Sequence, residues 1–328
     1  MEHTYDIITV GDAKLDVFLV LPEVANVCSV DHEHSTLCLP FGTKIDVDNS
    51  QFLMGGNAAN VSVGLARLGI KTALCAEIGD DEFSLKIINS LAREEIDRGL
   101  VTYTQHSISS FSVILEVGGD RTIFSQHIHR PHNFKLDNFT AQYVYITSLG
   151  EEWKMPYDYV LKWAKEHQVK IAFNPGSLQL GAGREAIQDI LQNTEILFLN
   201  KEEALHLTGA EVRAERLEDN KELLVATQKL GPKIVVITDG VKGSFAMDEK
   251  GQMYSQTVFP ANLVGRTGAG DAFSSGCLAA IFWQQPLPTA LQWGAANSAA
   301  VVEHIGAETG LLKKEELEAR VNNSRINE

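Results

Sequence analysis

The residues best suited to chemistry form one short stretch, Gly268-Ala269-Gly270-Asp271, just before an apolar run, Ala272–Trp283, that we expect to be a helix. Small residues before a helix let consecutive backbone N–H groups point at one ligand, and the helix dipole adds partial positive charge. The stretch therefore predicts an anion site for phosphate or for a phosphoryl group in transfer. Because a carboxylate repels phosphate, Asp271 is expected to take the proton of an attacking hydroxyl. The alternative is that Asp271 only caps the helix.

Two kinds of element are expected to position this stretch. From Tyr143 onward, short apolar strands alternate with helical segments, which is the βαβ rhythm of a parallel sheet with helices on both faces. Ligands of such sheets bind at the carboxyl ends of the strands. Period-two alternation in residues 22–54 and 101–129 instead predicts short antiparallel strands.

The segment Thr267–Phe273, together with Gly276, resembles the C-terminal signature of the ribokinase-like, or phosphofructokinase-B type, carbohydrate kinases. The family's other signature begins Gly-Gly-Asn, and Gly55–Asn60 matches it far upstream. Two signatures in the right order are much more specific than either alone, and the resemblance extends from Gly11 to about Gly306.

This resemblance implies an α/β fold with a central, mainly parallel sheet, helices on both of its faces and a small β-sheet lid. The whole chain, 1–328, would be one kinase domain, with the lid formed by about 15–54 and 101–129. The implied activity is ATP-dependent phosphorylation of a hydroxyl of a sugar or sugar-like molecule, with Mg²⁺ as cofactor. Asp271 would be the base, and Gly268, Ala269 and Gly270 would form the anion hole.

A substrate site is implied near the upstream signature. In the family an Asp shortly after the first strand binds sugar hydroxyls, and Asp16 matches that pattern. Gly55 and Gly56 allow a ligand to approach the backbone, whereas Asn57 and Asn60 can donate and accept hydrogen bonds with a polyol. The alternatives are a strand-edge carboxylate for Asp16 and a capped structural helix after the glycines.

A nucleotide and metal site is implied by the later part of the chain. Asn200 and Glu203 have the spacing of the family's Asn-x-x-Glu motif, which helps place Mg²⁺ and phosphate. Magnesium often keeps several waters, so Glu203 is expected to act through water. The alternative is an ordinary helix cap followed by a Glu in the first turn. The other residues implied at the nucleotide are Thr238, Gly240, Gly243, Arg266, Thr267 and Asn297.

One departure from the family pattern lies beside the anion site. Where the family often has Asp-Thr-Thr, this chain has Gly265-Arg266-Thr267. In family members activated by potassium, that Asp belongs to the site of the ion. We expect the guanidinium of Arg266 to take the place of the ion, so that activity needs no K⁺. Binding of Arg266 to a phosphate of ATP or of a phosphorylated substrate stays open.

The composition argues against several other functions. The chain has 328 residues and a formal net charge of −15, so general binding to nucleic acid or to an anionic membrane is not expected. Its four cysteines include no Cys-x-x-Cys pair, which indicates reduced thiols in a cytoplasmic protein. The N-terminus has no signal-peptide pattern, and no apolar stretch is long enough for a transmembrane helix.

The motifs of other nucleotide-binding folds are absent from the sequence, while two other functions stay open. The chain has no P-loop motif and no Gly-x-Gly-x-x-Gly after the first strand. A nucleoside kinase of the same fold remains open, because Asn174–Gly176 and the unusual segment 22–54 do not identify the substrate. A non-catalytic sugar- or nucleotide-binding regulator would be marked by loss of the base, yet Asp271 is present. The exposed edges of the lid strands favour a homodimer through the lid.

Two groups of histidines lack the spacing of a metal site. Asp31–His34 does not place two histidines on one helix face, and a loop tip is expected there. His127, His129 and His132 are expected to be surface or substrate-side polar residues, and their role stays open.

Overall fold

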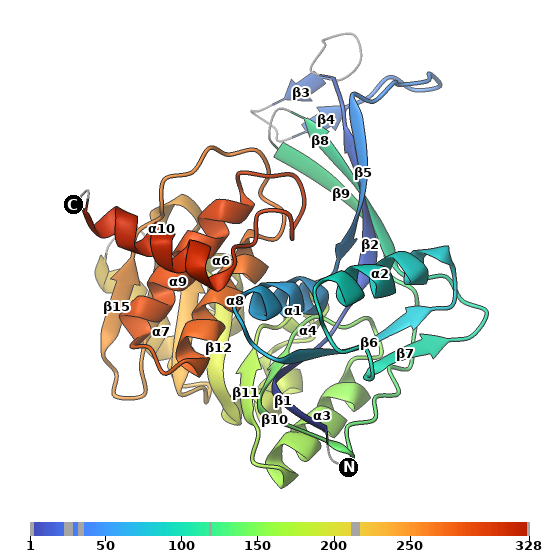
Figure 1. The fold of residues 1–328 in the computed structure, drawn as a ribbon. Coiled ribbons are helices and arrows are strands. Elements are labelled where there is room, and N and C mark those ends of the chain that lie inside the picture. The colour runs from blue at the N-terminus through green and yellow to red at the C-terminus, as the bar shows by residue number, and fades with distance from the viewer. Residues whose placement is uncertain (1–2, 23–28, 32–35, 118–119, 211–216, 327–328) are drawn as a thin grey trace.

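A nine-stranded sheet forms the centre of the protein (Figure 1). The structure is a computed structural model that describes residues 3–22, 29–31, 36–117, 120–210 and 217–326. The strand order is β15-β14-β13-β12-β11-β10-β1-β6-β7, and all neighbours are parallel except in the β13–β14 and β14–β15 pairs. The bounds are β1 (His3–Val10), β6 (Thr72–Gly79), β7 (Val101–Thr104), β10 (Phe139–Ile146), β11 (Lys170–Phe173), β12 (Thr194–Asn200), β13 (Ile234–Thr238), β14 (Ser244–Met247) and β15 (Met253–Gln256).

Helices cover both faces of this sheet, because successive residues of a strand point to opposite sides. Along β10, Val144 and Ile146 pack with α3, α5, α6 and α7, whereas Tyr143 and Tyr145 pack with α1, α8, α9 and α10. Burial on both faces explains why these strands are almost continuously apolar in the sequence. The helix bounds are α1 (Asn57–Arg67), α2 (Glu82–Arg93), α3 (Lys154–Glu166), α4 (Ser177–Gly181), α5 (Gln188–Gln192), α6 (Lys201–Thr208), α7 (Leu217–Gln228), α8 (Ala269–Phe282), α9 (Leu287–Val301) and α10 (Lys314–Ile326).

A separate small sheet extends away from the large one (Figure 1). Its order is β5-β2-β8-β9, with β2 antiparallel to β5 and parallel to β8. A hairpin of β3 and β4 follows β2 in the chain. The bounds are β2 (Lys14–Val20), β3 (Ser29–Asp31), β4 (Thr36–Cys38), β5 (Asn49–Gly55), β8 (Phe111–Val117) and β9 (Asp120–Gln126).

One part of the expected lid range lies elsewhere. The strand β7, at the start of the range 101–129, pairs with β6 and extends the parallel ladder of the large sheet. Alternation along a short strand indicates that it pairs, but not with which sheet edge, so the sequence could not separate β7 from β8. Of the segment Asp31–His34, where a loop tip was expected, Asp31 ends β3 and the other three residues lie outside the described residues.

The two halves of the chain meet where α1 crosses α8. A Cβ on Gly64 of α1 would lie only 2.2 Å from the Ser275 Oγ of α8, so this glycine lets the two helices approach closely. The crossing brings the start of α1, which follows the small sheet, beside the start of α8. None of the helices in the described parts of the chain has the length and apolarity needed to cross a membrane.

Candidate active site

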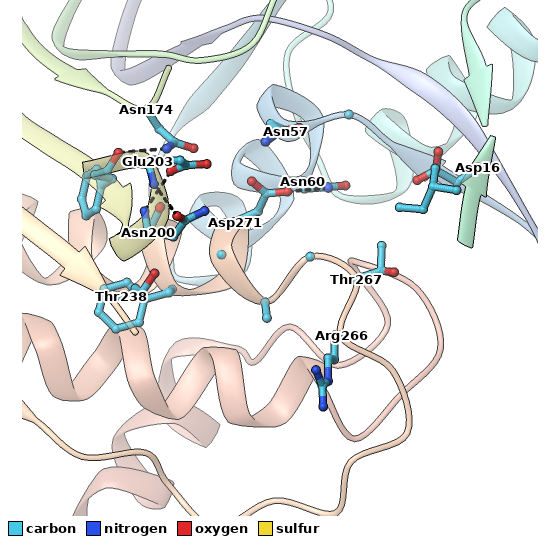
Figure 2. A pocket seen from close by; sticks show the side chains of 18 of the residues that line it. Asp16, Asn57, Asn60, Asn174, Asn200, Glu203, Thr238, Arg266, Thr267 and Asp271 are labelled. Carbon is cyan, nitrogen blue, oxygen red and sulfur yellow. Dashed lines mark hydrogen bonds between the residues drawn. The ribbon is translucent and has the colours of Figure 1, made fainter. Parts of the chain in front are cut away.

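A cavity of about 310 Å³ lies between the small sheet, the start of α8 and the carboxyl ends of the large-sheet strands. It brings together most of the residues that the sequence indicated. Those that line it are Asp16, Gly56, Asn57, Asn60, Asn200, Glu203, Thr238, Arg266, Thr267, Gly268, Ala269, Gly270 and Asp271. Figure 2 labels ten of the lining residues, which come from both halves of the sequence.

Asp271 lies in the first turn of α8 and faces this cavity. Its side chain does not cap the helix, since the cap residue is Gly268 and α8 has no side-chain cap. Instead, Asn60 Nδ2 donates a 2.7 Å hydrogen bond to Asp271 Oδ2 (Figure 2). Burial raises the pKa of Asp271 from 3.8 to about 7, although the Asn60 hydrogen bond and the charge of Lys14 lower it. The carboxyl group can therefore exchange a proton near neutral pH.

The backbone in front of Asp271 forms a tight turn where the sequence predicted an anion hole. Gly268 has a φ of 80°, in the left-handed region, and a Cβ there would lie 2.4 Å from the Ala307 Cβ. Glycine is therefore required at this position. A Cβ on Gly270 would meet nothing within 4 Å, so this side of the turn is open. The first N–H groups of a helix have no acceptor inside the helix, and here they lie at the cavity.

Asp16 lies on the small-sheet side of the cavity. It is 5% exposed, and its Oδ1 has no hydrogen-bond partner among the described residues. Burial raises the pKa of Asp16, while Lys14 and a hydrogen bond from Ser112 lower it. Gly55 does not line the cavity but is needed beside it, because a Cβ there would lie 2.1 Å from Asp16 Oδ2.

Three buried polar atoms of the cavity residues have no partner in the described parts of the chain. They are Asp16 Oδ1, Asn60 Oδ1 and Thr267 Oγ1. A buried polar group without a hydrogen bond is costly, by about 1–3 kcal/mol. These atoms therefore indicate where a polar ligand completes the site.

Asn200 and Glu203 form a capping box at the start of α6. Asn200 Oδ1 accepts from the Glu203 backbone N–H, and Glu203 Oε2 accepts from the Asn200 backbone N–H, both at 2.8 Å. Burial raises the pKa of Glu203. Both residues therefore cap α6, as the structural alternative predicted, and both also line the cavity. One amide and one carboxylate suit Mg²⁺ held partly through water, because this ion prefers oxygen ligands and keeps its waters.

Three residues expected at the nucleotide lie outside the cavity lining. Gly240 and Gly243 bound the turn that follows Thr238, and Gly243 (φ 92°) lies against the Gln256 carbonyl. Asn297 is fully buried between α8 and α9. It donates to the Ala272 carbonyl at 3.0 Å and accepts from the Leu312 N–H at 3.0 Å. These contacts give Asn297 a structural role, because burial in a helix interface leaves its amide no access to a nucleotide.

Sequence reasoning missed two cations and a hydroxyl on the small sheet. Lys14, Ser112 and Arg121 line the cavity beside Asp16. Lys14 is two residues before Asp16 on β2, so strand alternation would have placed both on one face. Arg121 could not be found in this way, because its place depends on how β9 pairs with β8. In that register Arg121 lies opposite Glu116.

The histidines do not form a metal centre in the described residues. His127 Nε2 lies 3.2 Å from Ser125 Oγ, and His129 Nε2 lies 2.9 Å from Glu152 Oε1. His132 is buried, and burial lowers its pKa to about 4.

A mainly parallel sheet covered on both faces, with a glycine turn and a buried carboxyl at the carboxyl ends of its strands, has the arrangement of an α/β enzyme with a ligand site. The match to the family model "pfkB family carbohydrate kinase" over residues 24–314 shows that the chain belongs to that family and is a carbohydrate kinase. A ribokinase of Haemophilus influenzae is 28% identical over 302 residues, which are 88% of this chain and 94% of that protein.

The names of other relatives indicate different acceptors. A cytidine kinase of Thermococcus kodakarensis is 28% identical, over 83% of this chain and 93% of that protein. Among solved structures, Arabidopsis thaliana ribokinase complexed with ribose and ATP has the same fold. It gives a TM-score of 0.76 at 20% identity and covers 97% of this chain and 99% of that one.

Proposed function

We propose that the protein transfers a phosphoryl group from ATP to a hydroxyl of a sugar or a nucleoside. The observation that carries this proposal is the buried Asp271, with a pKa of about 7, at the start of α8. A base is most effective when its pKa lies near the working pH. The hydrogen bond from Asn60 orients the carboxylate, so that its free oxygen can accept the proton of the attacking hydroxyl.

The anion hole supplies the second part of the reaction. N–H groups at Gly268–Gly270 stabilise the charge on the phosphoryl group in transfer, because they are already oriented before the reaction. Asn200 and Glu203 would hold Mg²⁺, which neutralises charge on the phosphates. Thr238, Arg266 and Thr267, which line the cavity, would contact the phosphates of ATP, and Asp16 and Asn57 would bind acceptor hydroxyls.

The small sheet is proposed to be a lid that excludes water from this site. Ser112, Ile114 and Ile123 of β8 and β9 face the cavity, together with Lys14, Asp16 and Arg121. Water would otherwise compete with the acceptor as nucleophile.

We also propose a homodimer through the exposed edges of this sheet. Cys75 and Cys277 are buried free thiols, which fits the reducing cytoplasm that we infer as the location.

Activity is proposed to be independent of potassium. Gly265 occupies the place where an ion-binding Asp would be, and a Cβ there would lie 3.5 Å from Glu116 Oε1 of the small sheet. Arg266 is exposed, and its side chain points away from Asp271 (Figure 2), so the proposal rests on the missing Asp and not on the expected replacement of the ion by the Arg266 guanidinium. A strong rate increase when sodium is exchanged for potassium would contradict this.

ATP consumption with Mg²⁺ against a panel of sugars, sugar acids and nucleosides tests the proposal. The cations Lys14 and Arg121 in the cavity justify the acid arm of the panel, and the cytidine kinase relative justifies the nucleoside arm. Turnover of one class identifies the acceptor. No turnover, with ATP still bound, would favour a regulator of the same fold, and loss of ATP binding as well would refute the proposal.

A further inference from the structure

The anion hole rests on a loop that we call the backing loop, residues 302–313. Ala307 of this loop lies directly against Gly268, so closely that a Cβ on Gly268 would be 2.4 Å away. The start of the same loop accepts hydrogen bonds at the Val302 carbonyl from the N–H groups of Val264 (2.8 Å) and Gly265 (3.1 Å). The position of the backing loop therefore decides where the N–H groups of the anion hole point.

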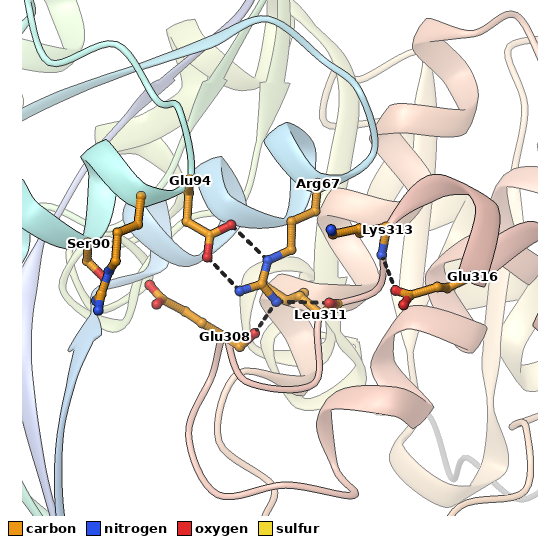
Figure 3. Close-up of polar contacts among 8 residues, drawn as sticks. Arg67, Ser90, Glu94, Glu308, Leu311, Lys313 and Glu316 are labelled. Atoms are coloured by element: carbon orange, nitrogen blue, oxygen red, sulfur yellow. Dashed lines mark hydrogen bonds and ion pairs between the residues drawn. The ribbon is translucent and has the colours of Figure 1, made fainter.

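Arg67, the last residue of α1, holds the far side of this loop (Figure 3). Its Nη1 donates to the carbonyls of Glu308 (2.7 Å) and Leu311 (2.9 Å). Its Nε and Nη2 donate to the two carboxylate oxygens of Glu94, at 2.9 and 2.7 Å. A guanidinium can make this planar fork and still reach two carbonyls, whereas a lysine cannot.

A second contact fixes the other side of the loop. Asn297 accepts from the Leu312 N–H and donates to the carbonyl of Ala272, the residue that follows Asp271. The backing loop is thus held between α1 on one side and the first turn of α8 on the other. All of these contacts join groups of the chain itself.

The same helix carries both ends of the arrangement. Near its start, Asn60 binds the Asp271 carboxylate, and at its end Arg67 binds the loop that supports Gly268. The close crossing at Gly64 and Ser275 fixes α1 against α8 between these two points. A shift of the backing loop would therefore move the Gly268 turn relative to Asp271, whereas Asp16 and Thr238 lie on strands outside this loop.

We propose that Arg67 is a positioning residue for phosphoryl transfer. Its guanidinium holds the backing loop so that the N–H groups at Gly268 face the phosphoryl group in transfer. This inference rests on the proposed function. The competing interpretation is that the pair of Arg67 and Glu94, with side chains 20% and 22% exposed, only stabilises the fold.

The chain offers a matched control for stability. Arg320 also makes a two-pronged pair with a glutamate, Glu303, at 3.0 and 3.1 Å, and donates to the Pro260 carbonyl at 3.1 Å. The exposed fractions of its pair, 25% and 30%, are similar. Glu303 belongs to the backing loop, but among the described residues of this loop Arg320 binds only the Glu303 side chain and donates to no backbone carbonyl, so this variant loses a matched ion pair without losing a carbonyl anchor of the loop.

The test compares Arg67→Lys with Arg320→Lys by kcat, KM and Tm, once wild-type turnover is established. For Arg67→Lys we expect kcat to fall about 10- to 100-fold, with KM for ATP and for the acceptor changed by less than about threefold. Arg320→Lys should lower Tm by a similar amount and leave kcat near the wild-type value. A kcat of Arg67→Lys within about fivefold of wild type, or an equal loss in both variants, overturns the proposal.

A binding measurement separates this proposal from the proposed function. ADP with aluminium fluoride and Mg²⁺ mimics the phosphoryl group in transfer. Arg67→Lys should bind this mixture at least about tenfold more weakly than wild type and bind ADP alone equally well. Equal binding of the mimic by both proteins overturns the positioning role. If Arg67→Lys does not fold, Glu94→Gln is judged by the same criteria, because it frees the guanidinium from its anchor. An inactive wild type that binds neither ADP nor the mimic would instead refute the proposed function.

Discussion

Replacing Asn60 with alanine should shift the acidic limb of the pH–rate profile to higher pH. Asn60 donates a 2.7 Å hydrogen bond to the Asp271 carboxylate, and this bond lowers a pKa that burial has raised to about 7. A hydrogen bond to a charged group contributes about 1.5–3 kcal/mol, and one pH unit corresponds to about 1.36 kcal/mol. Without Asn60, the pKa of Asp271 should therefore rise to about 8–9.

The sign of the effect on activity follows from the role of the base. Only the ionised carboxylate can accept the hydroxyl proton, so kcat/KM should fall about tenfold for each pH unit below the pKa. At pH 7 the ionised fraction of Asp271 should drop from about one half to between about 10% and 1% in Asn60→Ala. Activity should return as the pH is raised to about 9 or above.

The assay is kcat/KM for the acceptor from pH 5.5 to 9.5 at saturating ATP and Mg²⁺. Asn57→Ala is the matched control, because it changes the same residue type on the same cavity wall without a bond to Asp271. Its overall rate can fall, but its acidic limb should stay at about 7. If the limb of Asn60→Ala also stays at about 7, the hydrogen bond does not set the pKa and the reasoning is refuted.

The remaining predictions concern the base, the metal site and the helix crossing. Asp271→Asn should lose at least about 10²-fold in kcat. Burial raises the pKa of Asp271 from 3.8 in the unfolded chain to about 7 in the folded protein, so the folded state holds this proton more tightly. The stability that the protonated carboxyl gives at acid pH is therefore lost as the pH rises from about 4 to about 7. The Tm of Asp271→Asn should therefore exceed that of wild type at pH 8 but not at pH 4, and equal Tm values at pH 8 would contradict the raised pKa. Asn200→Ala should lower stability by about 1 kcal/mol in urea unfolding through loss of its cap, and it should raise the Mg²⁺ concentration needed for half-maximal rate. An unchanged Mg²⁺ dependence would mean that Asn200 only caps α6 and does not help to hold the ion. Gly64→Ala should lower stability by about 1–3 kcal/mol in the same assay, because the new Cβ meets Ser275 Oγ at 2.2 Å. Unaltered stability would mean that α1 and α8 can separate at little cost.

Local sequence was sufficient for the parts of the site that depend on local backbone geometry. Gly268–Asp271 predicted both a turn that only small residues allow and a carboxylate at its end, and the structure places them at one cavity. The alternation of apolar strands and helices predicted the parallel sheet, because residues buried on both faces of a strand must all be apolar. Asn200 and Glu203 gave their capping box in the same way, since its bonds close within four residues.

The tertiary structure alone decided which distant residues meet. The contact of Asn60 with Asp271 joins residues 211 positions apart, and it depends on the close crossing of α1 and α8. The direction of the Asn297 amide was likewise undetermined, because only the packing of α9 against α8 turns it inward. Arg121 reaches the cavity only through the register of β8 and β9. The sequence by itself determined the backbone turns and the chemistry that they can hold, because those follow from bonds within a few residues. The packing of helices and the register of strands decided which side chains complete the site. Both depend on contacts between distant segments, and local sequence does not predict how such segments lie relative to one another.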